Sequence, residues 1–224
     1  EKNIIRKIRQ HIDETYGPRK SKSEVVELGP FVKGKIKALR PGFKHRKCRL
    51  RTYVSQTSPN FIPPDVLGKV VEGLVRNAVE NTPDGGNISV KVRKGEFGPE
   101  FEVKDNGIGI SEENLRLIFE NYFTSYDTMQ YSTRQPYDFK AGGKGFDLLR
   151  MKIFSERYNF KIKMTSRPCQ LVDAKGQECP GHVADCTPLA DAKDCHNSGG
   201  TTVTVQFYPA KRFSKRQTSG KRKR

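Results

Sequence analysis

The long apolar segment that ends near residue 82 contains an asparagine that could bind a ligand. Val70, Leu74 and Ala78 recur at helical spacing, and Asn77 falls within the same stripe. A buried amide without partners would cost about 1–3 kcal/mol, so we expect Asn77 to have one. Its oxygen suits a hard cation such as Mg²⁺, whose other ligands are phosphates and water. The alternative is a structural amide that bonds a loop carbonyl, and this residue alone leaves both open.

A turn with the sequence DNGIGI, residues 105–110, follows an expected strand and precedes an expected helix. Gly107 and Gly109 permit positive φ and a close approach of a ligand to the backbone. Asp105 supplies a hydrogen-bond acceptor that points into the space left by these glycines. Taken alone, the turn could equally be an ordinary loop that binds nothing.

A second glycine turn, AGGKGF at residues 141–146, leads into another expected helix. Gly143, Lys144 and Gly145 make a composition suited to binding an anion through backbone N–H groups and the start of a helix. A glycine cluster by itself is weak evidence for a site. The second glycine turn becomes evidence for a site because it follows Asn77 and Asp105 along the chain.

Periodicity and turn signals predict the elements that must position these residues. The expected helices are residues 1–16, 31–39, 64–81, 111–123 and 146–158. The expected strands are residues 48–55, 87–94, 100–105, 161–166 and 201–207. Helices and mostly antiparallel strands do not alternate as repeated βαβ units, which predicts the α+β class with helices on one face of an open sheet. We expect residues 124–140 to form a mobile loop and residues 167–198 to be irregular.

The positive charge is concentrated at the two ends of the chain. Of the 224 residues, 1–50 hold 15 Lys/Arg against 5 Asp/Glu, 211–224 hold 8 against 0, and the middle holds 19 against 20. The basic end, residues 211–224, is therefore expected to be a solvated, disordered tail, and nucleic acid is not expected as a partner. A hydrophobic share of 34% indicates a folded chain. No stretch approaches the length of a membrane-spanning helix, so we expect a soluble segment.

In order and spacing, these segments resemble the GHKL nucleotide-binding fold, and specifically the ATP-binding catalytic domain of bacterial two-component sensor histidine kinases. The resemblance covers about residues 24–210 and rests on the helical Asn, Asp-x-Gly-x-Gly, IFENYF, a long loop, Gly-x-Gly and GGTTVTVQF. It implies a two-layer α/β sandwich of the Bergerat type that holds Mg-ATP beneath a mobile lid at residues 124–140. Residues 1–20 would then be the end of a dimerisation helix and a linker.

The resemblance also implies a role for each motif residue. Asn77 is similar to the magnesium-binding asparagine of the family's N box, and Asp105 to the carboxylate that recognises the adenine amino group. Thr201 resembles the threonine that supports this aspartate. The remaining matches belong to the glycine boxes, the phosphate-side lysine and the aromatic F box: Gly107, Gly109, Gly143, Lys144, Gly145, Phe119 and Phe123.

The function implied by the resemblance is transfer of the γ-phosphate of ATP to a histidine. ATP and Mg²⁺ would be the cofactors, and the partners would be the protein's own dimerisation and phosphoacceptor domain, in a homodimer, and a response regulator. His11 is expected to be an exposed helix residue, with the acceptor histidine upstream of Glu1. The domain is expected in the cytoplasm, with membrane tethering of the full-length protein left open.

The chain departs from the family pattern at four positions, one of which is Asn81, where the family often has an aromatic residue. Gly73 stands where the family has a second polar residue, Glu80 where it often has a basic one, and Asp147 where it usually has a glycine. A carboxylate near a triphosphate is repulsive unless a cation intervenes. These positions leave open a second function, a catalytically weak nucleotide sensor or scaffold with the same fold.

The expected insertion at residues 167–198 is rich in cysteine. It holds two histidines, His182 and His196, and four cysteines, Cys169, Cys179, Cys186 and Cys195. The spacing lacks a Cys-x-x-Cys pair, so a structural zinc, two disulfides and free thiols all remain open. A cytosolic location would disfavour disulfides.

Overall fold

The computed structural model describes residues 22–117, 135–141, 146–173, 178–187 and 191–208. The main sheet has five strands in the order β2-β4-β5-β7-β6. Its strands are β2 (Arg49–Val54), β4 (Asn87–Lys94), β5 (Pro99–Asp105), β6 (Lys161–Arg167) and β7 (Gly200–Gln206). Only β2 and β4 pair in parallel, and the other neighbours are antiparallel. The predicted class, with a mixed and mostly antiparallel sheet, is therefore confirmed.

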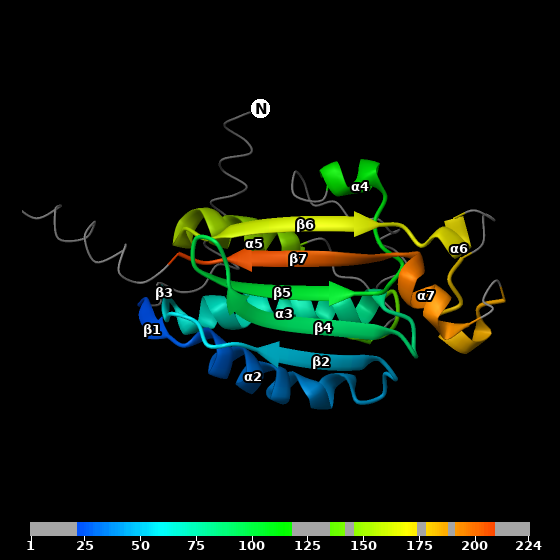
Figure 1. Cartoon of the computed structure of the whole chain (residues 1–224), viewed down its shortest axis with the longest axis horizontal. Coiled ribbons are helices and arrows are strands. Elements are labelled where there is room, and N and C mark those ends of the chain that lie inside the picture. Colours follow the sequence, from blue (N-terminus) through cyan, green and yellow to red (C-terminus); the bar gives the residue numbers. More distant parts are fainter. Residues whose placement is uncertain (1–21, 118–134, 142–145, 174–177, 188–190, 209–224) are drawn as a thin grey trace, which may run out of the picture.

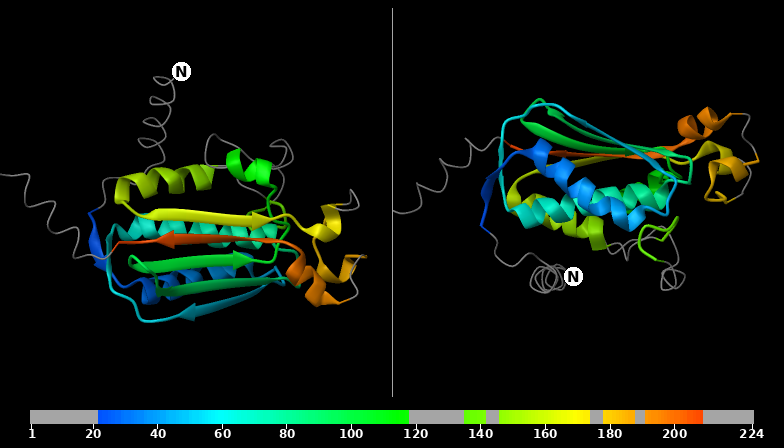
Figure 2. Two further views of the ribbon diagram at one scale, coloured as in Figure 1. Left: turned by 45° about the horizontal axis from the view of Figure 1, so that its top comes forward. Right: turned by 90° about the horizontal axis from the view of Figure 1, so that it is seen from below.

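Three helices cover one face of this sheet, and none of the described helices covers the other face (Figures 1 and 2). They are α2 (Leu28–Leu39), α3 (Pro64–Asn81) and α5 (Phe146–Tyr158). Figure 2 shows the sheet nearly on edge in its right-hand view, with all three helices on the same side. The two-layer arrangement expected from the sequence is thus present. None of the helices in the described ranges is long and apolar enough to cross a membrane.

The core lies between the helices and the sheet because both present apolar side chains to each other. Ile88, Val90 and Val92 alternate with more exposed residues along β4, as expected for a strand with one covered face. The facing stripe of α3 includes Val71, Leu74 and other buried residues at helical spacing. Pro64 stands at the first turn of α3, where its missing N–H costs nothing.

The two outer strands of the sheet carry exposed cationic side chains. β2 exposes Arg49 and Arg51, and β6 exposes Lys161, Lys163 and Arg167. On both strands these residues alternate with less exposed ones. The cations therefore occupy the side of each outer strand that faces away from the helices.

Several short elements were not expected from the sequence. β1 (Glu24–Val26) and β3 (Asn60–Ile62) form a small antiparallel sheet, and a 3₁₀ turn, η1 (Arg40–Phe43), follows α2. Elements of three or four residues are too short to show a period. Helix α2 begins at Leu28 rather than at residue 31. The expected helix at 1–16, the linker to residue 20 and the tail at 211–224 lie outside the described residues.

The prediction that residues 167–198 are irregular is wrong for the described part of this segment. It contains α6 (Gln170–Asp173), a 3₁₀ turn, η3 (Val183–Asp185), and α7 (Ala192–Ser198). The start of α7 is fixed by a capping box between the side chains and backbones of Asp191 and Asp194. Such local polar contacts define these short helices, and hydrophobic periodicity cannot detect them.

Candidate functional site

Asp105 is the last residue of β5, and its carboxylate is buried with 6% of the residue exposed. Its Oδ1 accepts hydrogen bonds from the backbone N–H groups of Gly107, at 3.0 Å, and Thr201, at 3.1 Å. Burial raises the pKa of Asp105 to about 7, although both hydrogen bonds lower it. The side chain is therefore a fixed acceptor that titrates near neutral pH.

The turn after Asp105 is clamped between two other segments, which explains its glycines. A Cβ on Gly107 would lie 2.1 Å from the carbonyl oxygen of Asn81, at the end of α3. Gly109 has φ +66, and a Cβ there would lie 1.9 Å from the carbonyl oxygen of Arg167, at the end of β6. The sequence interpretation assigned these glycines to the approach of a ligand. In the structure, the protein's own main chain occupies that space.

Thr201 supports Asp105 through its main chain rather than through its hydroxyl group. The Thr201 N–H donates to the carboxylate, whereas Oγ1 lies 2.8 Å from the Oγ of Ser166. Ser166 in turn accepts from the N–H of Ile110 at 2.9 Å and donates to the carbonyl of Gly200 at 3.1 Å. β6, β7 and the Asp105 turn are thus tied together by one serine.

Asn77 lies on α3 and is half-buried, so the expectation of a buried amide is wrong. The apolar stripe of α3 is narrower than its sequence pattern, because Arg76 and Asn77 both lie at its margin. No described residue hydrogen-bonds to the side-chain amide of Asn77, and solvent can satisfy it. One turn later, the Asn81 side chain donates to the Asn77 carbonyl at 2.8 Å, and the Asn81 carbonyl accepts from Ile108 N–H at 3.1 Å. α3 therefore leads from Asn77 directly to the Asp105 turn.

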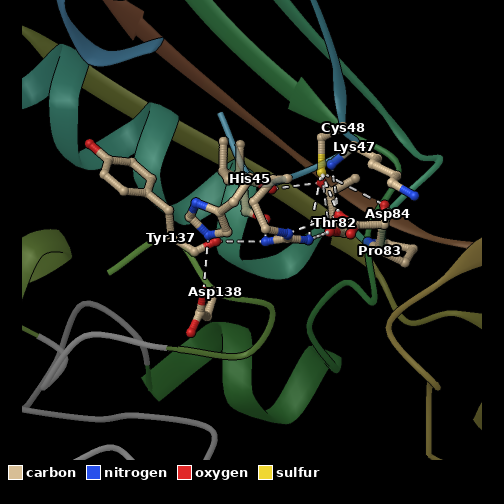
Figure 3. A network of polar contacts seen from close by, with 11 residues as sticks. His45, Lys47, Cys48, Thr82, Pro83, Asp84, Tyr137 and Asp138 are labelled. Carbon is tan, nitrogen blue, oxygen red and sulfur yellow. Dashed lines mark hydrogen bonds and ion pairs between the residues drawn. The ribbon is translucent and has the colours of Figure 1, made fainter. Parts of the chain in front are cut away.

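Arg46 caps the end of α3, and sequence reasoning missed it. Its guanidinium is 5% exposed and donates from Nε to Oδ1 of Asp84 at 2.8 Å. It also donates to the carbonyls of Val79, at 3.0 Å, and Thr82, at 2.7 Å, at the end of the helix, where the Val79 carbonyl also accepts from the Thr82 N–H at 3.4 Å. A further bond, 2.6 Å long, reaches the carbonyl of Tyr137 (Figure 3). In the sequence, Arg46 stands in a cationic run that is typical of an exposed surface.

Glu80 fastens the described end of the expected lid to α3. It is 4% exposed, and its Oε1 accepts from the N–H of Tyr137 at 3.1 Å. The carbonyl of Glu80 accepts from the N–H of Lys140 at 2.7 Å. Residues 135–141 therefore form a turn held against the last turn of α3. Glu80 stands where the family pattern often has a basic residue, and its described contacts are with this turn.

Of the other residues that the sequence predicted for the site, the structure describes only some. Gly73 is buried within α3. The F-box residues, most of the expected lid and the second glycine box lie outside: Phe119, Phe123, residues 124–134, Gly143, Lys144 and Gly145. Asp147 belongs to α5, and its side chain is not described.

The cysteine-rich insertion lies at the same end of the sheet as Asp105 (Figure 1). The N–H of Cys169 donates to the carbonyl of Ile108 at 2.9 Å, and the side chain of Asn106 donates to the carbonyl of His196 at 2.6 Å. All five cysteines have free thiols in the structure. As the described side chains stand, no group of three or more His, Cys, Asp or Glu residues is arranged to hold a metal ion.

Comparison with known proteins finds relatives with similar sequences. DNA mismatch repair protein MutL of Neorickettsia sennetsu is 30% identical over 149 residues, which cover 60% of this chain and 21% of MutL. Sensor-like histidine kinase SenX3 of Mycolicibacterium smegmatis is 29% identical over 103 residues, covering 46% of this chain and 25% of SenX3. The chain thus spans about a quarter or less of the length of these relatives.

A solved structure of the mycobacterial sensor histidine kinase MprB has the same fold. It matches with a TM-score of 0.56 at 17% identity and covers 84% of this chain and 99% of MprB's. Residues 63–212, more than half of this chain, match the family described as histidine kinase-, DNA gyrase B-, and HSP90-like ATPase. The matched range includes α3, the Asp105 turn and β7, which carry the site. The chain therefore belongs to this ATPase family and has the fold of sensor histidine kinase catalytic domains.

Proposed function

We propose that this chain is the catalytic domain of a two-component sensor histidine kinase and that it binds Mg-ATP beside Asp105. The observation that carries the proposal is the buried Asp105 carboxylate, held in place by two main-chain N–H groups. An acceptor fixed in this way at the end of a strand suits the amino group of adenine, which is a donor. Membership of an ATPase family supports the same ligand.

The adenine end of the site is Asp105 with Gly107, Gly109 and Thr201. Ionised Asp105 is an acceptor only, whereas the protonated acid carries an O–H donor on one oxygen, so its pKa of about 7 makes the strength of the contact with the adenine amino group depend on pH. The turn that contains the two glycines is clamped by main chain, so the carboxylate meets the base without rearranging. Preorganised contacts of this kind favour binding because little entropy is lost.

The phosphate end of the site is Asn77, Glu80 and the glycine box Gly143, Lys144 and Gly145. The half-buried Asn77 amide offers an oxygen to solvent, and amide oxygens are among the ligands that hard cations accept. Asn77 would thus contribute one ligand to Mg²⁺, which supplies charge neutralisation to the phosphates when bound. By their resemblance to the second glycine box, residues 143–145 would bind phosphate through N–H groups.

In this proposal, the γ-phosphate passes to a histidine on an upstream dimerisation domain within a homodimer. A response regulator would then receive it, and the reaction would take place in the cytoplasm. The sensor histidine kinases among the relatives support this reading, although MutL shows that the family also serves other processes. Phosphoryl transfer needs little covalent chemistry from the protein, so positioning and electrostatics would provide most of the catalysis.

Calorimetric titration with ATP, with and without Mg²⁺, tests the proposal. Asp105→Asn keeps an oxygen that can accept both N–H bonds but presents an amide to the adenine amino group. We expect it to weaken ATP binding about 100-fold, since a hydrogen bond to a charged group contributes about 1.5–3 kcal/mol. Asn77→Ala should reduce only the Mg²⁺-dependent part of the affinity.

The matched control is Asp65→Asn, the same change at an exposed position in the first turn of α3. It should leave ATP affinity unchanged. If wild type binds no ATP, or if Asp105→Asn and Asn77→Ala both bind ATP as wild type does, the proposed site is wrong.

A second candidate function is a nucleotide sensor with little phosphoryl transfer. It is favoured by Glu80, which replaces a basic residue of the family pattern and is engaged with Tyr137. Autophosphorylation of the full-length protein separates the two functions. ATP binding without phosphohistidine would favour the sensor, whereas acid-labile phosphohistidine would favour the kinase.

A further inference from the structure

The outer face of the main sheet, which lies away from α2, α3 and α5, carries most of the charged side chains of its strands (Figure 2). Successive side chains of a strand point to opposite faces, and residues paired in register share a face. Ile88, Val90 and Val92 are buried toward the helices, so the residues between them, and the partners of those residues, point outward. The charged residues that point outward are Arg49, Arg51, Lys91, Arg93, Glu100, Glu102, Lys104, Lys161, Lys163 and Arg167.

Cations outnumber carboxylates by eight to two among the described residues of the outer face. Glu100 accepts from Nε of Arg93 at 3.1 Å. Glu102 lies 3.0 Å from Nη2 of Arg93 and 3.5 Å from Nζ of Lys91. The six other cations form no ion pair with a described carboxylate. The outer face therefore keeps an excess of six positive charges.

Folding produces this cationic surface from a part of the chain that is nearly neutral. Residues 51–210 hold 19 Lys/Arg against 20 Asp/Glu, so their composition does not predict a polyanion as a partner. The period of two along each strand then places apolar residues toward the helices and cations on the outer face. A partner meets the charge of one face and not the average charge of the segment.

Hydroxyl groups lie between the cations of the outer face. One row across the sheet runs in register from Arg51 through Ser89, Lys104 and Thr202 to Thr165. Side chains directly opposite each other on paired strands have Cβ atoms about 4.5–5.5 Å apart. The Ser89 hydroxyl, between the two cations, has no hydrogen-bond partner among the described residues. The row thus combines charge with hydrogen-bonding groups that can contact a phosphate.

The composition of the outer face favours the phosphate backbone of a duplex over other anionic partners. Its uncharged side chains are of the types Tyr, Asn, Ser, Thr and Gln, which contact phosphates in DNA complexes together with Arg and Lys. A membrane surface also requires apolar side chains, and Tyr53 is the only exposed large hydrophobic residue described on this face. A single strand requires several aromatic residues on which its bases stack. The centre of a protein interface is normally depleted of charge.

We propose that the outer face of the sheet binds the phosphate backbone of duplex nucleic acid without reading its sequence. Five strands about 4.8 Å apart span about 19 Å, and duplex DNA carries about eleven phosphates over that length. None of the described helices covers this face, so none is placed there to enter a groove, where bases are read. The Asp105 side chain shares the helix-covered side with Ile88, its partner in register. The proposal is therefore independent of the proposed ATP site.

Fluorescence anisotropy with a labelled duplex DNA of mixed sequence tests the proposal on the full chain. The outer-face variant combines Lys104→Gln, Lys161→Gln and Lys163→Gln, all at exposed positions. We expect it to weaken duplex binding about 10- to 100-fold at about 0.1 M salt. The slope of log K against log salt concentration should fall by about 3, because each lost phosphate contact contributes about 0.9. Two duplexes of unrelated sequence should bind wild type equally.

The matched control combines Lys33→Gln, Lys37→Gln and Lys44→Gln, which are exposed on or just after the helical layer. It removes the same charge and leaves both basic ends of the chain unchanged. We expect its affinity for the duplex to stay within about twofold of wild type. Both variants should match wild type in the free energy of unfolding measured with urea, since all six lysines are exposed.

Three results would overturn the proposal. In the first, wild type does not bind duplex DNA even at about 0.05 M salt. In the second, both triple variants weaken binding equally, which would assign the affinity to net charge or to the ends of the chain. In the third, vesicles of phosphatidylserine and phosphatidylcholine lose affinity for the outer-face variant while duplex DNA does not. That result would assign the outer face to a membrane surface.

Discussion

At the proposed adenine end, a side chain is positioned by main-chain N–H groups, whereas at the proposed phosphate end a side chain positions main chain. Asp105 receives bonds from the backbones of Gly107 and Thr201, and Glu80 accepts from the backbone of Tyr137. The first arrangement leaves the carboxylate available to a ligand, because the fold alone holds it. The second uses the carboxylate to hold a turn. At Glu80, the fold therefore uses a residue that departs from the family pattern to hold the turn at residues 135–141.

The largest effect is expected from Arg46, which holds α3 and the turn at Tyr137 together. Arg46→Met removes the guanidinium but keeps an apolar stem. It removes the cationic donor from Asp84 and one donor from each of several carbonyls, and breaking such a buried ion pair costs about 3–5 kcal/mol. We expect this loss in the free energy of unfolding measured with urea. Arg51→Met, on the exposed side of β2, should change it by less than about 0.5 kcal/mol.

The stability contributed by Asp105, at the proposed adenine end, should depend on pH. The pKa of Asp105 is raised from 3.8 to about 7, so the folded state keeps a proton that the unfolded state has lost between these values. The free energy of unfolding contributed by this group therefore falls as pH rises from about 4 to about 7. Asp105→Asn cannot titrate at this position. Its free energy of unfolding relative to wild type should therefore rise with pH across this interval, on the order of 1.4 kcal/mol per pH unit and a few kcal/mol in total. Urea unfolding at pH 5 and pH 8 measures this difference, and a constant difference contradicts it.

The clamped turn at the adenine end should not accept a side chain at Gly107. In Gly107→Ala the new Cβ would overlap the Asn81 carbonyl, and we expect a loss of about 1–3 kcal/mol in the free energy of unfolding. Gly34→Ala is the matched control, because its Cβ would meet no atom within 4 Å and it lies inside α2. That substitution should stabilise the protein by about 0.5–1 kcal/mol. Thermal unfolding of both variants checks that Gly107→Ala lowers the stability and that Gly34→Ala raises it.

The smallest effect is expected when only the charge of Glu80 is removed. Glu80→Gln keeps an oxygen that accepts from Tyr137 N–H and removes only the charge. If the carboxylate repels bound phosphates, ATP affinity should increase about two- to fivefold in calorimetry, with stability nearly unchanged. Glu80→Ala also removes the acceptor and should lower stability by about 1–3 kcal/mol. Equal ATP affinity in wild type and Glu80→Gln would show that this carboxylate does not act on the phosphates.

The sequence predicted the long elements and the strand-end carboxylate, because these follow from periodicity and local motifs. Helix α3, the hairpin of β4 and β5, and β7 all match the expected ranges closely. It could not reveal the role of Arg46, whose carboxylate and carbonyl partners lie 33 to 91 positions away. The same limit applies to Glu80, since its contact with Tyr137 depends on how the chain returns to α3. The burial of Asn77 was misjudged because an apolar pattern does not give the width of the stripe that a neighbour covers.

The exposed cations on β2 and β6 have a consequence for the behaviour of the protein in concentrated solution. In the described sheet these are the outermost strands, and an outer strand offers unpaired backbone groups to another chain. Arg49 and Arg51 on one rim and Lys161, Lys163 and Arg167 on the other would bring like charges together if two sheets joined edge to edge. Part of the net charge of +17 thus acts against aggregation.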